Sequence, residues 1–60
     1  MTVRDFIEPI VYYQDIAICN SDYDVECACK ATEVPNKFLI HTVTSVVTEK
    51  DVIFIRCSDL

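Results

Sequence analysis

The hydrophobic pattern is strongest near the C-terminus, where two apolar segments flank a short charged stretch. Residues 41–47 read HTVTSVV and residues 52–57 read VIFIRC, with Glu49, Lys50 and Asp51 between them. β-Branched and aromatic residues at this density favour a pleated, half-buried strand. The pattern therefore predicts a β-hairpin from His41 to Cys57, around which the rest of the chain is arranged.

The register of this hairpin depends on the length of its loop. If Ile53 and Ile55 face the core, Arg56 faces away from it. A two-residue turn at 49–50 would turn Val46 inward and would need positive φ at both residues. Because the chain contains no glycine, we predict a three-residue loop, Thr48–Lys50, instead. The inward residues of the first arm are then Val43, Ser45 and Val47.

The N-terminal segment has the periodicity of a short amphipathic helix. Thr2 and Asp5 have the spacing of a capping box. Four apolar residues then recur at helical spacing on one side: Val3, Phe6, Ile7 and Ile10. Pro9 disfavours a helix interior, so we expect the helix to end or kink near Glu8.

Two further strands are predicted between this helix and the C-terminal hairpin. Asp15–Cys19 and Val25–Lys30 flank a turn at Asn20–Tyr23. Pairing their apolar faces brings Ile16 and Ile18 opposite Val25, Cys27 and Cys29. The segment Thr32–Leu39 breaks the strand pattern, and its Pro35 suits the start of a helical turn.

Together these elements predict an α+β domain over residues 1–60. An N-terminal helix packs on a small, four-stranded, mainly antiparallel sheet, in the order helix, hairpin, short turn, hairpin. The predicted core consists of Phe6, Ile7, Ile16, Ile18, Val25, Phe38, Leu39, Val43, Ile53 and Ile55.

Length and charge narrow the classes of protein to consider. A domain of 60 residues is marginally stable unless a disulfide, a metal or a second subunit supports it. The net charge of −5 repels nucleic acid and anionic membranes. The N-terminus has no secretory signal pattern, and the longest uncharged run is too short for a bilayer span. We therefore expect a cytoplasmic protein with reduced thiols that binds neither nucleic acid nor membranes.

The four cysteines leave three interpretations open. Their spacing, C-x₇-C-x-C-x₂₇-C, lacks the C-x₂₋₄-C pairs of most structural zinc sites. We favour small apolar residues of the sheet core over zinc binding or disulfides, and we expect no cofactor. The alternative function is that of a small cysteine-dependent metal-binding or redox protein.

Neither the single histidine nor the acidic residues form a catalytic motif. His41 opens a strand without a recognisable partner, so we expect a structural role and no enzymatic activity. The acids around the first turn lack the glycine and the spacing of a calcium loop. They form either a solvated turn or an acidic patch for a basic partner.

The second face of the predicted sheet is too apolar to remain exposed in a small soluble domain. Val46, Val52 and Phe54 are expected there, beside Ala17, Cys19, Ala28, Thr42 and Thr44. Tyrosine is favoured in interfaces, so Tyr23 joins the candidates. The predicted partner-binding residues are Val46, Val52, Phe54, Asp22, Tyr23, Asp24 and Glu26.

Three tracts resemble small proteins encoded by phages and prophages of Firmicutes: the opening MTVRDFIEPI, the segment TEVPNKFL, and the closing V-x-S-V…DVIFI. In those proteins a short helix precedes two hairpins joined by a P-x-x-x-L turn. They include inhibitors of host defence, such as anti-CRISPR proteins and the Hachiman anti-defence protein. The resemblance implies a non-catalytic binder acting in the bacterial host cytoplasm, and it transfers no functional residues.

From the residues and the resemblance together we expect a protein-interaction module that inhibits a host defence protein by direct binding. A mimic of nucleic acid that uses the acidic turn is a further alternative. Because so small a chain builds little core, we also expect a homodimer through the apolar face, with Phe54 at its centre. The segment Val52–Cys57 is a candidate for an edge strand that such a dimer would cover.

Overall fold

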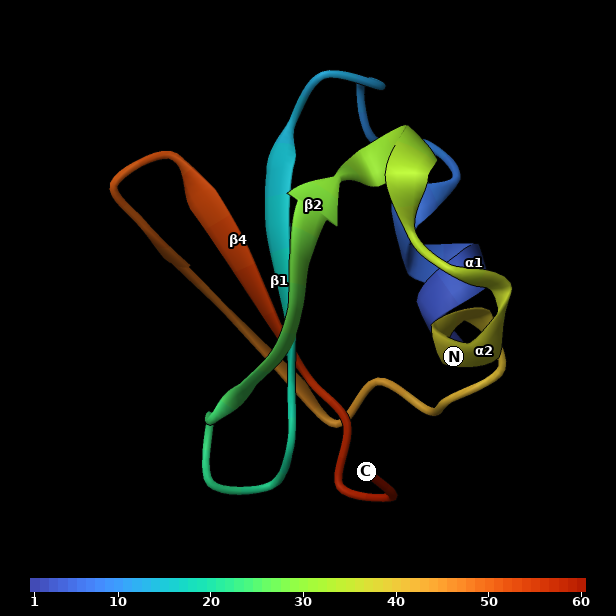
Figure 1. Cartoon of the computed structure of the whole chain (residues 1–60), viewed down its shortest axis with the longest axis vertical. Coiled ribbons are helices and arrows are strands. Elements are labelled where there is room, and N and C mark those ends of the chain that lie inside the picture. The colour runs from blue at the N-terminus through green and yellow to red at the C-terminus, as the bar shows by residue number, and fades with distance from the viewer.

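The computed structural model describes all 60 residues, which form four strands and three short helical segments. Figure 1 shows the sheet on one side and the helical segments on the other. In chain order the elements are α1 (Val3–Ile7), β1 (Asp15–Cys19), β2 (Val25–Lys30), the 3₁₀ helix η1 (Ala31–Glu33), α2 (Asn36–Leu39), β3 (Ser45–Glu49) and β4 (Val52–Arg56).

The four strands form one mixed sheet in the order β2-β1-β4-β3. Both hairpins are antiparallel, and the sheet is completed by a parallel pairing of β1 with β4. The predicted α+β class and mainly antiparallel sheet are confirmed.

The position of β4 differs from the expectation, because this strand lies in the centre of the sheet and not at an edge. Ile16 pairs with Ile53 and Ile18 with Ile55 across the β1–β4 boundary. VIFIR is the more apolar arm of its hairpin, compared with SVVTE, which fits β4 to the central position and β3 to the edge. The edge strands are therefore β2 and β3.

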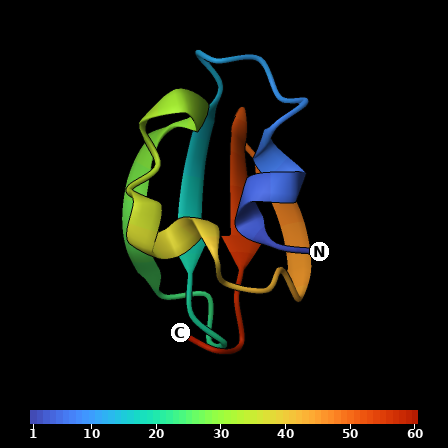
Figure 2. The same cartoon turned by 90° about the vertical axis from the view of Figure 1, so that its right-hand side faces the viewer.

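The helical segments cover only one face of the sheet. In Figure 2, α1, η1 and α2 all lie in front of the strands. The predicted capping box of α1 is present: the Asp5 N–H donates to Thr2 Oγ1 at 3.2 Å, and the Thr2 N–H donates to Asp5 Oδ2 at 3.4 Å. The helix ends at Ile7 with Glu8 as its C-cap, so Pro9 falls just outside it, as expected.

The core lies between the helical layer and the sheet. Its buried residues are Val3, Ile16, Ile18, Val34, Phe38, Ile55 and Cys57, with Phe6, Ile7, Cys27, Cys29, Leu39, Val43, Ile53 and Leu60 packed against them. Nine of the ten predicted core residues are among these. Val25 is the exception: it is 52% exposed, because the register shifts between Ile18 and Cys19 and pairs Val25 with Cys19.

The loop of the second hairpin is shorter than predicted. Glu49 pairs with Val52, so the turn has two residues, Lys50 and Asp51, with φ of 51° and 65°. This is the positive-φ turn whose backbone twist suits a two-residue hairpin. The predicted three-residue loop is therefore wrong, and Val46 pairs with Ile55.

None of the short helical segments has the length and hydrophobicity that a membrane-spanning helix requires.

Candidate protein-binding site

The sheet face opposite the helices is the candidate site, and we call it the open face. Strand alternation assigns to it the side chains that do not point towards the helical layer. Its central row crosses all four strands, because Ala28 pairs with Ala17, Ala17 with Phe54, and Phe54 with Val47. A second row follows towards the β3–β4 turn and contains Lys30, Asp15, Val52 and Glu49.

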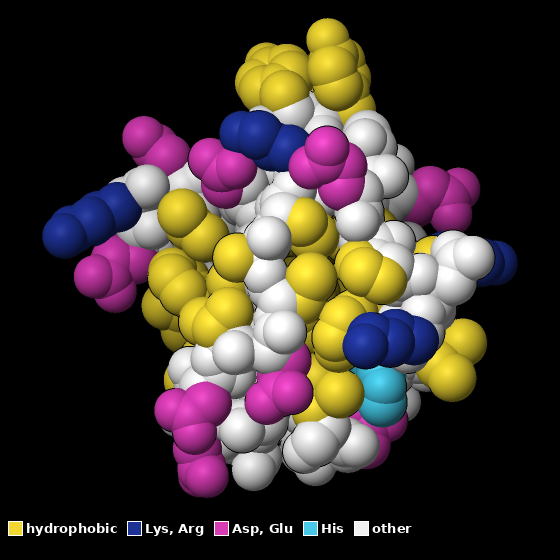
Figure 3. Space-filling view, viewed as in Figure 1, with side chains coloured by type: hydrophobic (Ala, Val, Ile, Leu, Met, Phe, Trp, Pro, Cys, Tyr) yellow, Lys and Arg dark blue, Asp and Glu magenta, His cyan; other side chains and the backbone are white.

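The open face is apolar at its centre and charged at its border. Val47 is 46% exposed, and Phe54 and Val52 are half-buried without a helix above them. Figure 3 shows hydrophobic side chains gathered over the β4 side of the sheet, with charged groups beyond them at the β3–β4 turn. Lys30 and Asp15 form an ion pair in the border row.

The first turn folds onto the far end of the open face and forms the Tyr23 cluster, which consists of Tyr23, Ser45 and Arg56. Tyr23 Oη lies 2.7 Å from Ser45 Oγ, and Arg56 Nε donates to the same oxygen at 2.9 Å. Arg56 also donates from Nη1 to the Ser21 carbonyl at 3.1 Å, and its guanidinium lies 5.7 Å from the centre of the Tyr23 ring. This cluster connects β3, β4 and the first turn.

A polar residue at the start of the first turn fixes the backbone that carries Tyr23. Asn20 Oδ1 accepts hydrogen bonds from the N–H groups of Asp22 and Asp24, at 2.9 Å and 3.0 Å. Tyr23 itself has φ of 64°, a conformation that costs free energy for a residue with a side chain. The hydrogen bonds of the turn and of the Tyr23 cluster hold it there.

Four residues of the open face and the first turn line a shallow depression, the Tyr23–Phe54 hollow, with a volume of about 270 Å³. Tyr23 and Phe54 supply its aromatic walls, Val47 an aliphatic wall and Glu49 its only charge. The hollow brings the first turn and both strands of the second hairpin to one place.

The predicted partner-binding residues are distributed more widely than expected. Val52 and Phe54 lie on the open face, as predicted, and Tyr23 reaches it through the Tyr23 cluster. The placement of Val46 is wrong: its pairing with Ile55 puts it on the helix side of the edge strand, where it is 36% exposed. The cause is the two-residue turn, which exchanges the faces of the β3 residues.

The acidic residues of the first turn are exposed, and none forms an ion pair in the structure. Glu26 alternates with Cys27 and therefore lies on the open-face side of β2. Thr42 and Thr44, which were expected on this face, precede β3; Thr42 instead forms a bridge with Thr2.

Sequence reasoning missed three residues of the open face, namely Ser45, Val47 and Glu49. The alternation of side chains along β3 places all three on one face. Which face that is follows only once the length of the turn is known.

The cysteines are all free thiols in two locations. Cys19 and Cys57 are fully buried, and burial raises the pKa of both thiols. Cys27 and Cys29 face the helices, with their Sγ atoms 3.9 Å apart. Burial, a hydrogen bond with Cys27 and the nearby negative charge raise the pKa of Cys29 to about 11. No group of three or more metal-ligating side chains comes together, so the alternative zinc function has no assembled ligand set.

His41 has a structural partner near the C-terminus. Its Nδ1 lies 3.2 Å from Asp59 Oδ1, and the Thr42 N–H donates to Asp59 Oδ2 at 3.5 Å. Desolvation raises the pKa of Asp59, but these hydrogen bonds outweigh that effect and hold the pKa below its usual value. The pair ties the C-terminal residues to the segment before β3.

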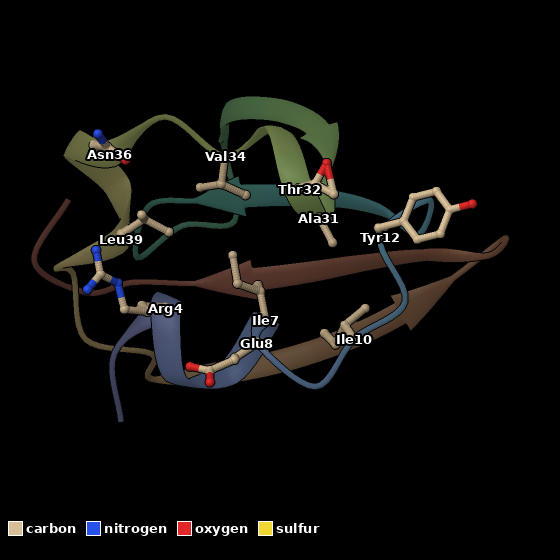
Figure 4. A pocket seen from close by; sticks show the side chains of 10 residues that line it. All are labelled: Arg4, Ile7, Glu8, Ile10, Tyr12, Ala31, Thr32, Val34, Asn36 and Leu39. Carbon is tan, nitrogen blue, oxygen red and sulfur yellow. The ribbon is translucent and has the colours of Figure 1, made fainter.

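The largest hollow of the molecule is a groove on the helix side, with a volume of about 510 Å³. In Figure 4, Ile7 projects from α1 and Val34 from the segment before α2 towards the space between them, and Tyr12 lies at one end. Arg4 and Glu8 are the only charged residues that line it. Most of its lining is hydrophobic, so the groove offers mainly apolar contact.

Comparisons with protein-family models, with curated proteins and with solved structures found no match to this chain.

Proposed function

We propose that this chain is a non-enzymatic protein-interaction module that binds a host defence protein through the open face and inhibits it. The phage-encoded origin comes from the sequence resemblance. The fold supports the proposed binding mode.

The observation that carries the proposal is the one-sided cover of the sheet. All helical segments pack on one face, while Phe54, Val47 and Val52 remain accessible on the other. Apolar patches that interrupt a charged surface are typical of protein-interaction sites. Phe54 lies in the central row of this surface and Tyr23 at one end of it, and aromatic residues of this kind often dominate binding energy.

The size of the open face limits how a partner can bind. Four strands about 4.8 Å apart and five residues long, at about 3.3 Å per residue, span roughly 300 Å². A standard interface buries about 800 Å² on each partner. A partner must therefore also contact the first turn, which adds Tyr23 and the exposed acids Asp22 and Asp24. Their charge favours a basic partner surface.

The free chain is expected to form the homodimer through this same face, and the partner to displace the second copy. Two copies each carry a net charge of −5, which opposes their association. Because β4 is central, Val52–Cys57 is not the edge strand that was expected to pair with a second copy; the edges of the sheet are β2 and β3. A basic partner surface is attracted by the negative charge that opposes a second copy. The host protein is therefore the occupant that the open face fits best.

The test is capture of a partner from a bacterial lysate by the tagged chain and three variants. Phe54→Asp and Val47→Asp each place a charge on the open face, and Val47 is exposed enough for its variant to fold. Ile40→Asp makes the same change at a residue that is 77% exposed and outside the open face.

The proposal requires a protein that the unchanged chain and Ile40→Asp both capture and that both open-face variants lose. Circular dichroism of each variant is the control that checks that the variant is folded. Capture that survives both open-face changes, or the absence of any specific partner, would overturn the proposal.

A further inference from the structure

We infer that the Tyr23–Phe54 hollow receives a basic side chain, arginine or lysine, from the bound partner. This assignment rests on the protein-binding function proposed above and adds the chemistry of the group that is recognised.

The size and lining of the hollow match one long side chain. Its volume of about 270 Å³ is below the roughly 300–1,000 Å³ of pockets that take whole small molecules. Val47 and Phe54 offer apolar walls for the methylene stem of an arginine or lysine, which buries its stem while its head remains polar. Tyr23 and Phe54 both line the hollow, and aromatic rings attract a cation that lies over their faces.

Glu49 makes the hollow negatively charged. It is the only charged residue of the lining, and neither of the two ion pairs in the structure uses its carboxylate. An incoming guanidinium or ammonium would therefore meet an uncompensated charge. The further acids near the face, Asp22, Asp24 and Glu26, add to the negative potential that attracts a basic partner.

Arg56 shows that the ring of Tyr23 accepts a cation, because its guanidinium already lies 5.7 Å from the ring centre. Its hydrogen bonds to Ser45 and to the Ser21 carbonyl hold it in the Tyr23 cluster. Its positive charge opposes a second cation nearby, so binding in the hollow depends on Glu49 to offset that repulsion. Glu49 is thus the residue whose neutralisation should matter most.

The aromatic wall formed by Tyr23 is set before any partner binds. Its positive φ of 64° is held by the 2.7 Å contact with Ser45 and by the Asn20 hydrogen bonds. Strained residues of this kind concentrate at binding sites, where the surrounding structure fixes them. A wall that needs no ordering lowers the entropic cost of binding.

The experiment is an NMR titration of the isotope-labelled chain with the peptide acetyl-Ala-Arg-Ala-amide. The matched probe replaces arginine by citrulline, which has nearly the same shape without the charge. We expect saturable shifts at Tyr23, Val47 and Phe54 with the arginine peptide, and affinity about fivefold or more lower with citrulline.

Two variants of equal net charge make the titration specific. Glu49→Gln neutralises the hollow and should weaken arginine-peptide binding by about fivefold or more. Asp51→Asn neutralises a residue of the adjacent turn that does not line the hollow, and asparagine tolerates the positive φ of this position. The affinity of this variant for the arginine peptide should stay within about twofold of the parent value. Equal binding of both peptides, or equal affinity of both variants, would overturn the assignment.

The captured partner separates a failure of this assignment from a failure of the proposed function. If Phe54→Asp and Val47→Asp abolish capture but Glu49→Gln leaves the affinity unchanged, the open face binds the partner without a basic side chain in the hollow. If none of these variants affects capture, the open face itself is not the interface.

Discussion

Replacing the β3–β4 turn by Asn-Gly, through Lys50→Asn with Asp51→Gly, should stabilise the protein. Both residues have positive φ, 51° and 65°, in a two-residue turn where Asn-Gly is the preferred sequence. A residue with a side chain loses roughly 1–2 kcal/mol in this conformation, and Asp loses less. The native sequence therefore carries backbone strain that the variant relieves.

The expected gain is the relieved strain minus the extra freedom that glycine adds to the unfolded chain. Lys50 and Asp51 together release roughly 2 kcal/mol, and the new glycine returns about 0.5–1 kcal/mol. The native contact of this turn survives, because Gln14 Nε2 donates to the backbone carbonyl of Asp51. A net gain of about 1 kcal/mol raises Tm by about 4–8 °C in a domain of this size.

Thermal and urea unfolding followed by circular dichroism, with a reductant present, measure this gain. The control is Lys50→Pro, which fixes φ near −65° where the structure needs a positive value, so it should be clearly destabilising. A variant with Asn-Gly that is no more stable than the parent, or a proline that is tolerated, would refute the two-residue turn. A turn of three residues would instead place Val46, and not Val47, on the open face.

Three further outcomes follow from burial and from the open face. Ile55→Ala should lower the free energy of unfolding by about 2–5 kcal/mol, out of a total of roughly 3–9 kcal/mol for a domain of this length. Val46→Ala on the edge strand should lower it by less than about 1 kcal/mol. Equal losses in urea unfolding would contradict the register. Cys19 and Cys57 should resist alkylation at neutral pH until the protein unfolds, because burial raises the pKa of both thiols; mass spectrometry showing rapid native labelling of either would show the core to be open. Light scattering at about 100 µM, above typical weak dimer affinities, should give a dimer mass that Phe54→Asp reduces to a monomer; a monomer without the substitution would exclude the second copy.

Local chemistry made much of the fold predictable. The capping box and the position of Pro9 define α1 within a few residues, and the apolar patterns locate all four strands. The bounds of one strand were wrong: the first arm of the second hairpin was expected at 41–47, whereas β3 spans Ser45–Glu49. Nine of the ten predicted core residues lie in the core because period-2 and period-3.6 patterns report directly which side of an element is apolar. Val25 fails because a bulge shifts its register, and single-strand alternation carries no signal for that shift.

The pairing of strands that are distant in the sequence was harder to predict. The parallel pairing of β1 with β4 joins segments more than thirty residues apart, and no local pattern distinguishes it from a pairing in chain order. The predictions for the candidate site contain both a register error and missing long-range contacts. Phe54 and Val52 were placed on the correct face from β4 alone, but Val46 was exchanged with Val47 by the turn length. Tyr23 reaches the site only through contacts with Ser45 and Arg56 that the sequence does not reveal.

The most direct test of the open face as the interface is methyl cross-saturation in the complex with the captured partner. The chain is labelled at its methyl groups, and the partner's protons are irradiated. The open-face interface predicts the largest signal losses at the methyl groups of Val47 and Val52, with Ile40 and Val11 unaffected. Saturation transfer concentrated at Ile40 or at the helix-side groove residues Ile7 and Leu39 would contradict it.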